Sequence, residues 1–133
     1  MAFAVALDDG LVVPVIRESN SKTIQVISEE LKSLSESAKK GNLGPDDFMG
    51  GTFTISILGS VDGFTPILNQ AQVGLLGVGR SVQKPVVRDG EVVVREMMTL
   101  SLTGDHQVVD GAVAASFFRR LQRLIESPSK LFS

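Results

Sequence analysis

The sequence predicts an α/β fold of the α+β type, a two-layer sandwich in which a mixed β-sheet carries helices packed on it. Short apolar runs are joined by Asp-Gly turns, which are typical of hairpins. Two amphipathic helical patterns are separated by these strand patterns rather than alternating with them. Hairpins join antiparallel neighbours, whereas parallel neighbours need long crossovers, so we expect a mixed sheet and not a doubly wound parallel one.

The chain opens on a predicted hairpin. Apolar runs at residues 3–7 and 11–16 flank Asp8-Asp9-Gly10. Pro14 lacks a backbone N–H group, which indicates that the second strand is an edge strand or irregular. Because the sequence begins directly in a strand pattern, we expect residues 1–133 to be the C-terminal part of a single larger domain.

The first helix is predicted from apolar residues at helical spacing within residues 24–38. The polar residues 19–21 can cap its start, and residues 39–41 (Lys-Lys-Gly) can end it. Residues 44–47 form an expected turn. The apolar stripe consists of Ile24, Ile27, Leu31, Leu34 and Ala38.

The remaining strands and the last helix follow in the second half of the chain. Expected strands cover residues 52–58, 73–78, 82–87 and 91–103. A second Asp-Gly turn at residues 88–90 makes the last two strands a hairpin. A helical pattern then runs through Val113, Phe117, Leu121 and Leu124 and ends before Pro128.

Composition excludes several classes of function. The net charge of −2 does not favour a nucleic-acid or anionic-membrane partner, and we expect neither. The absence of cysteine excludes a disulfide framework, a thiol nucleophile and a cysteine-bound metal. Since His106 is the only histidine, a His-rich zinc site is excluded as well, and no metal site is predicted.

Two weaker motifs are better explained structurally. The glycine-rich residues 74–79 lack the spacing of a dinucleotide fingerprint and the Lys-Ser/Thr end of a P-loop, so close strand packing is the preferred interpretation. Arg119, Arg120 and Arg123 could meet phosphate, but a solvated helix face is the simpler interpretation.

The segment from Asp105 to Gly111 contains candidate catalytic residues. The only histidine, His106, follows a predicted strand, and Asp110 stands four residues later. Spacing alone favours an ordinary loop histidine and a helix N-cap at Asp110.

A resemblance changes this interpretation. Residues 50–56, Gly-Gly-Thr-Phe-Thr-Ile-Ser, resemble a signature of the 2-oxoacid dehydrogenase acyltransferase core, the E2 component, and residues 106–111 resemble its His-x-x-x-Asp-Gly motif. Residues 10–16 and the glycines of residues 77–79 also resemble family segments, and the likeness runs in the family's order from about residue 3 to the end. It implies a chloramphenicol-acetyltransferase-like fold and transfer of an acyl group between dihydrolipoamide and coenzyme A.

The resemblance also implies site roles. His106 would be the general base for the coenzyme A thiol, Ser56 would donate a hydrogen bond to the tetrahedral oxyanion, and Asp110 would orient the site through a charged partner such as Arg17. Ser56, Ile57 and Gly79 would contact coenzyme A. A free thiol has a pKa near 8.5 and a free imidazole near 6.5, so complete proton transfer before attack costs roughly 2.7 kcal/mol.

The departures from the family pattern lie at other positions and leave His106, Ser56 and Asp110 unchanged. Ile57 stands where the family usually has Asn, Gln107 where Arg is common, and Gly104 where an aromatic residue is common. Residues 69–72, Asn-Gln-Ala-Gln, replace a typical Asn-Pro-Pro-Gln. These departures therefore affect the expected coenzyme A contacts and loop rigidity rather than the reaction type.

Partners and location follow from the same resemblance. It implies a homotrimer that assembles into a larger core, with a lipoyl group on a separate domain, E1 and E3 components bound through other domains, and the bacterial cytoplasm or mitochondrial matrix as the compartment. In the family the histidine and the serine of one site come from neighbouring subunits, so the isolated fragment is expected to be poorly active.

The acyl group is not fixed by the sequence, although acetyl or branched-chain transfer is favoured. Two alternatives remain open. One is a non-catalytic assembly core of such a complex, and the other is a chloramphenicol acetyltransferase-like enzyme.

Overall fold

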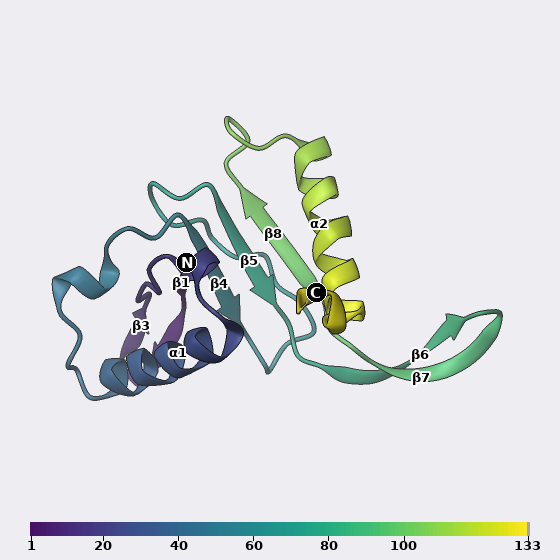
Figure 1. Ribbon diagram of the computed structural model, residues 1–133, viewed down its shortest axis with the longest axis horizontal. Helices are drawn as coiled ribbons and strands as arrows, with labels where there is room; N and C mark the ends of the chain where they lie inside the picture. Colours follow the sequence, from purple (N-terminus) through teal and green to yellow (C-terminus); the bar gives the residue numbers. More distant parts are fainter. Residues whose placement is uncertain (133) are drawn as a thin grey trace.

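The computed structural model describes residues 1–132 of the chain as a central sheet, two small hairpins and two main helices (Figure 1). The helices are α1 (Ile24–Lys39) and α2 (Gly111–Glu126). Short 3-10 turns cover Ser19–Ser21, Pro45–Phe48 and Pro128–Leu131. The strands are β1 (Ala2–Phe3), β2 (Val5–Leu7), β3 (Gly10–Val12), β4 (Phe53–Ile57), β5 (Gly74–Val78), β6 (Val82–Arg88), β7 (Glu91–Met97) and β8 (Leu100–Gly104).

The central sheet is mixed, as the sequence predicts. Its four strands lie in the order β1-β4-β5-β8. β1, β4 and β5 run parallel, and β8 pairs antiparallel to β5. Ser56 of β4 lies opposite Gly77 of β5, which in turn lies opposite Ser101 of β8. This register fixes the position of the candidate site residues relative to one another.

The first expected strand is divided between two sheets. Ala2–Phe3 pairs with β4, whereas Val5–Leu7 pairs with β3 in the first hairpin. Ala4 lies between them and donates its N–H to the Ile55 carbonyl at 2.9 Å. The second expected strand ends early at Val12, and Pro14 follows it in irregular backbone, as its missing N–H group predicts.

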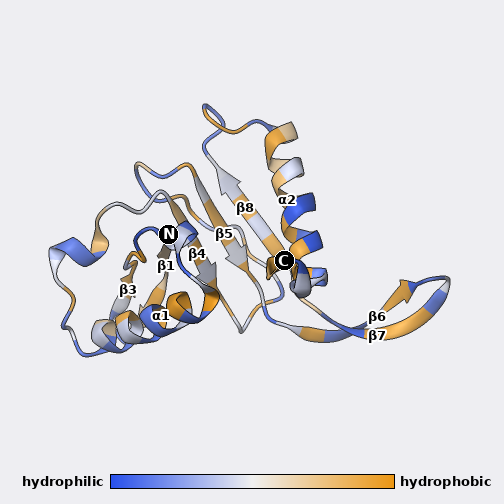
Figure 2. Cartoon of the chain, in the orientation of Figure 1, coloured by the Kyte–Doolittle hydropathy of each residue, from blue (hydrophilic) through white to orange (hydrophobic). Residues whose placement is uncertain are grey.

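The long strand expected over residues 91–103 is likewise divided. β7 pairs with β6 in an arm that extends away from the central sheet, and β8 returns to the sheet after Met98 and Thr99 (Figure 1). Asp89 and Gly90 both have positive φ at the tip of the arm, which confirms the predicted hairpin turn. Hydrophobic and hydrophilic stretches alternate along the arm in Figure 2, and its Val92 remains 74% exposed.

Both helices cover the same face of the sheet. Side chains alternate along a strand, so Phe53, Ile55 and Ile57 share one face of β4. The Phe53 ring lies 6.0 Å from the ring of Phe117 in α2. The α1 side of this face holds the main core cluster, which consists of Phe3, Val5, Ile16 and Ala38.

The opposite face is covered by a segment of residues 59–72, which we call the cover segment. A Cβ atom on Gly77 would lie 3.0 Å from the Phe64 ring and 3.2 Å from Pro66, so the segment packs directly on β5. Thr103 of β8 donates its hydroxyl to the Pro66 carbonyl at 2.6 Å. Thr54 and Ser56 lie on this face by strand alternation.

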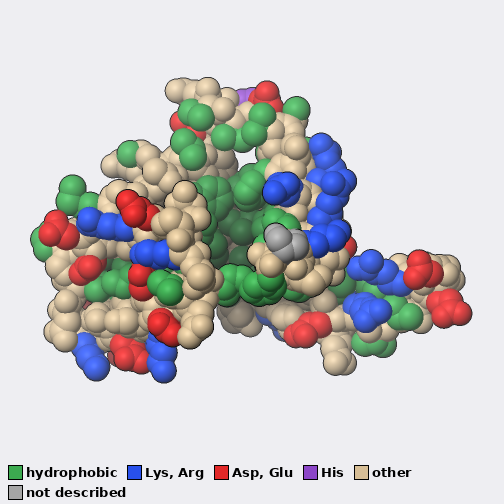
Figure 3. Space-filling model, viewed as in Figure 1, with side chains coloured by type: hydrophobic (Ala, Val, Ile, Leu, Met, Phe, Trp, Pro, Cys, Tyr) green, Lys and Arg blue, Asp and Glu red, His purple; other side chains and the backbone are tan. Residues whose placement is uncertain are grey.

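An apolar groove lies between α1 and the sheet. Its volume is about 660 Å³, and Ile55, Ile57, Ile27 and Leu31 are among its lining residues. Figure 3 shows apolar side chains gathered in the hollow between the two helices. Among residues 1–132, no helix has the length and apolar character needed to cross a membrane.

Candidate active site

Ser56 is the fourth residue of β4, near the carboxyl end of that strand. It is half-buried, and its strand position places its side chain on the face of the cover segment. Its pairing partner, Gly77, has no side chain, and the Phe64 ring and Pro66 occupy the space above that glycine. The hydroxyl of Ser56 therefore lies at the margin of a packed wall.

His106 lies in a tight turn between β8 and α2. Asp105 builds this turn: its side chain accepts the Gln107 N–H at 2.9 Å, and its carbonyl accepts those of Val108 and Val109 at 3.0 and 2.8 Å. The Asp105 N–H donates to the Val73 carbonyl at 3.1 Å, which ties the turn to the start of β5. His106 itself is exposed, and no hydrogen bond joins its ring to another of residues 1–132.

Asp110 is the N-cap of α2. Its carboxylate accepts the Val113 N–H at 2.8 Å, so the capping interpretation of this residue is confirmed. Arg17, considered as its charged partner, instead donates to the Asp46 carbonyl at 2.6 Å. The loop after β3 directs this guanidinium toward Pro45–Phe48, and no ion pair joins Arg17 to Asp110 within residues 1–132.

Ser56 and His106 do not meet within one chain. Ser56 is in register with Ser101, and Gly104 at the far end of β8 lies about 10 Å farther along the strands at 3.4 Å per residue. β4 and β8 are also two strand spacings apart, which adds roughly 9–10 Å across the sheet. His106 follows Gly104, so its ring is far beyond hydrogen-bonding reach of the Ser56 hydroxyl.

Of the other two expected coenzyme A contacts, Ile57 follows Ser56 in β4 and Gly79 lies just after β5. Ile57 points to the opposite face from Ser56, is 66% exposed and lines the groove beneath α1. Gly79 is buried just after β5, and its N–H donates to the Thr99 carbonyl at 2.9 Å. A Cβ atom at Gly79 would lie 2.0 Å from the Asp62 carbonyl oxygen, so close backbone packing alone requires glycine here.

One ion pair secures the cover segment at this end. Arg80 donates from Nε to Asp62 at 2.6 Å, and its backbone N–H donates to the Val61 carbonyl at 2.8 Å. The hydrogen bond from Arg80, and then its positive charge, lowers the pKa of the Asp62 carboxyl below its ordinary value.

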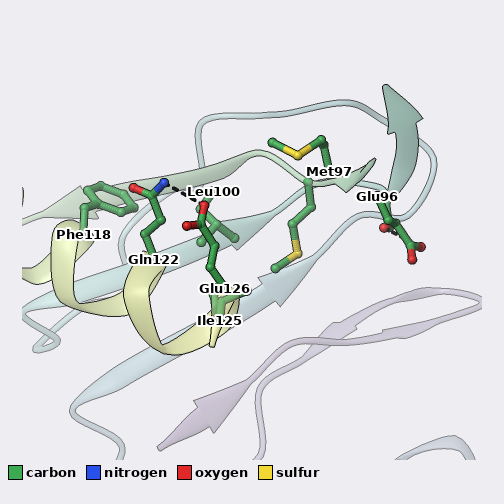
Figure 4. Close-up of a pocket in the computed structure, with 9 residues that line it drawn as sticks. Glu96, Met97, Leu100, Phe118, Gln122, Ile125 and Glu126 are labelled. Carbon is green, nitrogen blue, oxygen red and sulfur yellow. Dashed lines mark hydrogen bonds between the residues drawn. The ribbon is translucent and has the colours of Figure 1, made fainter. Parts of the chain in front are cut away.

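A second hollow lies between the base of the arm and the end of α2 (Figure 4). Its volume is about 570 Å³, and Met97, Leu100, Phe118 and Ile125 give it an apolar lining. Gln122 donates to Glu126 across one turn of α2 at 2.9 Å, as the close-up shows. Neither Ser56 nor His106 lines this hollow, so it is separate from the candidate chemistry.

No group of three or more His, Asp or Glu residues that could hold a metal ion occurs within residues 1–132. Arg119, Arg120 and Arg123 are exposed on α2, and Figure 3 shows basic side chains along that helix. This arrangement fits a solvated helix face.

Sequence reasoning missed a buried polar cluster next to Ser56. Thr54 is 1% exposed and forms hydrogen bonds with Gln72 and Asn69, the latter at 3.0 Å. The sequence pattern that could have predicted it is a threonine at a buried position of a strand, followed by two side-chain amides in the loop that leads to the next strand. It also missed the turn-building role of Asp105, for which an Asp at the start of a loop is a usual signal.

The fold and site define a class. A mixed sheet with both helices on one face, and a histidine turn leading from its last strand into a capped helix, is the architecture of acyltransferases with a chloramphenicol-acetyltransferase-like fold. The family model for the 2-oxoacid dehydrogenases acyltransferase (catalytic domain) matches residues 1–133, and the chain belongs to this family.

Relatives and solved structures agree with this membership. The chain is 41% identical over 133 residues to the dihydrolipoyllysine-residue acetyltransferase component of the pyruvate dehydrogenase complex from Staphylococcus aureus, covering 98% of this chain. It spans only 31% of the length of that relative.

Two solved structures superpose closely. One comes from work on the role of a serine, a histidine and an asparagine in the catalytic mechanism of Azotobacter vinelandii dihydrolipoamide acetyltransferase. It has a TM-score of 0.91 and 41% identity, covering 99% of this chain and 55% of that chain. The other is the cubic core of the pyruvate dehydrogenase multienzyme complex, with the same TM-score, identity and coverage. The predicted fold class is confirmed.

Proposed function

We propose that this chain forms the active-site part of a dihydrolipoamide acyltransferase, the E2 core of a 2-oxoacid dehydrogenase complex, with acetyl as the acyl group. Family membership and the acetyltransferase relatives support the reaction class. The separation of Ser56 from His106 within one chain is the observation that supports a site shared between subunits. Two groups that act on one thioester must approach it together, so a site containing both needs a second copy of the chain.

In the proposed reaction His106 accepts the proton of the coenzyme A thiol. The resulting thiolate sulfur attacks the carbonyl carbon of the S-acyl dihydrolipoyl group and forms a tetrahedral oxyanion. The bond from carbon to the lipoyl sulfur then breaks, and the departing dihydrolipoyl sulfur takes the proton back from His106. Coenzyme A leaves acylated, and no oxidant or reductant is consumed.

Ser56 is proposed to stabilise the oxyanion. Its hydroxyl lies at the margin of the wall formed by the cover segment, and we propose that a neighbouring subunit brings His106 and the acyl thioester to this margin. Removing one preorganised donor of this kind typically costs about 10²–10³ in rate. Exposure of the His106 ring is compatible with a base that must receive a substrate thiol from outside its own subunit.

The remaining site residues have supporting roles in this proposal. Asp110 orients the turn that carries His106, because it caps α2 directly after that turn. Ile57 and Gly79 contact coenzyme A, Ile57 beside Ser56 at the end of β4 and Gly79 through its backbone. Coenzyme A is the acyl acceptor, and the lipoyl group arrives on a separate domain.

The assembly is proposed to be a homotrimer within a larger core that works with E1 and E3 components, in the bacterial cytoplasm or the mitochondrial matrix. The cubic core among the similar structures supports assembly of this kind. Residues 1–133 are proposed to be the C-terminal part of one catalytic domain, since the solved chains extend well beyond the matched region.

Acyl transfer by the full-length protein tests the proposal. We expect His106→Ala and Ser56→Ala each to lower kcat by about 10²–10³ while the core still assembles. The test is an assay of acetyl transfer from S-acetyl dihydrolipoamide to coenzyme A, with sizing of each variant. Full activity in either variant would remove that residue from the mechanism.

A further inference from the structure

We propose that Thr54, Asn69 and Gln72 are positioning residues for Ser56, and that they hold β4 and the cover segment in one fixed arrangement. This inference rests on the proposed function of Ser56. The three side chains lie outside the set of residues to which the reaction itself assigns a role.

The cluster is a closed hydrogen-bond network around one buried hydroxyl. Thr54 Oγ1 donates to Gln72 Oε1 and accepts from Asn69 Nδ2 at 3.0 Å. Gln72 Nε2 donates to the Gly51 carbonyl at 3.3 Å, which fastens the network to the approach of β4. Because Thr54 uses its hydroxyl as both donor and acceptor, a serine can replace it chemically and a valine cannot.

The network acts where the cover segment rejoins the sheet. Gln72 donates its backbone N–H to the Asn69 carbonyl at 3.2 Å, so the two amides belong to one turn. Ala71 within this turn has φ of 61°, a conformation that is unfavourable for alanine and that the surrounding bonds must maintain. The buried Thr54 hydroxyl, which bonds to both amides of this turn, is therefore the fixed point that holds it against the sheet.

Ser56 is coupled to this fixed point by strand geometry. Thr54 and Ser56 are two residues apart on β4, so their side chains leave the same face about 7 Å apart. The same cover segment that Thr54 holds at residues 69–72 also places Phe64 and Pro66 over Gly77, the pairing partner of Ser56. A shift of this segment would change both the direction of the strand and the wall beside the Ser56 hydroxyl.

The experiment compares Thr54→Val and Thr54→Ser in the full-length assembled protein, with acetyl transfer to coenzyme A as the readout. A displaced oxyanion donor loses part of its effect, so we expect Thr54→Val to lower kcat about tenfold, with KM for coenzyme A within about twofold. Thr54→Ser should restore kcat to within about twofold of wild type. Thr52→Val is the matched control, because Thr52 is exposed and lies two residues before Thr54, and it should leave kcat unchanged.

A double-variant measurement separates positioning from general damage. If Thr54 acts through Ser56, then Thr54→Val should lower kcat no further in a Ser56→Ala background. Should Thr54→Val fail to assemble, Asn69→Ala carries the same measurement at a half-buried position.

Three outcomes would overturn the inference. They are an unchanged kcat in Thr54→Val, a loss that multiplies with that of Ser56→Ala, and a Thr54→Ser variant as impaired as the valine variant. A fully active Ser56→Ala protein would instead refute the proposed role of Ser56, and the positioning role would fall with it. The two failures are therefore distinguishable.

Discussion

Gly79 and Asp62 approach so closely that a Cβ atom at position 79 would lie 2.0 Å from the Asp62 carbonyl oxygen. The obstacle is backbone rather than a flexible side chain, so it cannot move aside without displacing the cover segment. The glycine after β5 therefore has a steric purpose, independent of any contact with coenzyme A.

This relationship predicts the effect of Gly79→Ala. We expect the variant to lose about 1–3 kcal/mol of unfolding free energy, the usual cost of forcing extra atoms into a packed site. Urea unfolding of the 133-residue chain measures this loss. Gly59→Ala, in the cover segment, is the control, because an added Cβ there meets no atom within 4 Å and the variant should be nearly neutral. Equal stability of the two variants would contradict the structure at Gly79.

The Asp62–Arg80 pair predicts a dependence of stability on pH. The pKa of Asp62 is lowered in the folded state, so the pair contributes stability above the unfolded pKa and loses it as pH falls through the lower folded pKa. Wild type should therefore exceed Asp62→Asn in urea midpoint at pH 7, and this difference should shrink at pH values below the ordinary aspartate pKa. Since the pair is solvent-exposed, the difference will be small and reduced by salt. Titration of Asp62 by NMR at or above an ordinary pKa would argue against it.

Two substitutions separate the helix-capping contribution of Asp110 from the contribution of its negative charge. Asp110→Ala removes the acceptor for the Val113 N–H, and we expect it to cost about 1 kcal/mol of stability. Asp110→Asn retains an acceptor oxygen and should stay within a few tenths of a kcal/mol of wild type. Thermal unfolding measures both variants. If the asparagine variant is stable but slow in acyl transfer in the full-length protein, the charge of Asp110 matters beyond the cap.

Much of the fold could be predicted because local patterns specify it. The apolar stripe predicts α1 almost to the residue, and the Asp89–Gly90 turn predicts the arm. The divided strands could not be predicted, since Ala4 and Met98 look like ordinary strand residues in the sequence. What divides the strands there is a change of pairing partner, which depends on tertiary contacts and leaves no mark in the alternation of side chains.

Only part of the candidate site could be predicted from the sequence, for a similar reason. The His106–Asp110 interval is local, so its turn and cap follow from sequence. The distance between Ser56 and His106 depends instead on the register of three strands, which local patterns do not contain. Thr54 escaped notice because an inward polar residue carries meaning only once its partners, Asn69 and Gln72, are known.

Mixed assemblies of two inactive variants provide the sharpest test of a site shared between subunits. In a trimer with head-to-tail interfaces, each site would combine His106 from one subunit with Ser56 from its neighbour. Refolding His106→Ala and Ser56→Ala full-length proteins together in equal amounts would then place both intact residues at about one interface in four, so about a quarter of wild-type kcat should return. The measurement is acetyl transfer to coenzyme A, and the control is the two variants assembled separately and then mixed, which should stay inactive. Failure of the co-refolded sample to regain activity, while both variants are present in particles of the wild-type size, would contradict a site shared between subunits. We expect activity to return, because the register of β4, β5 and β8 holds Ser56 and His106 apart within one chain.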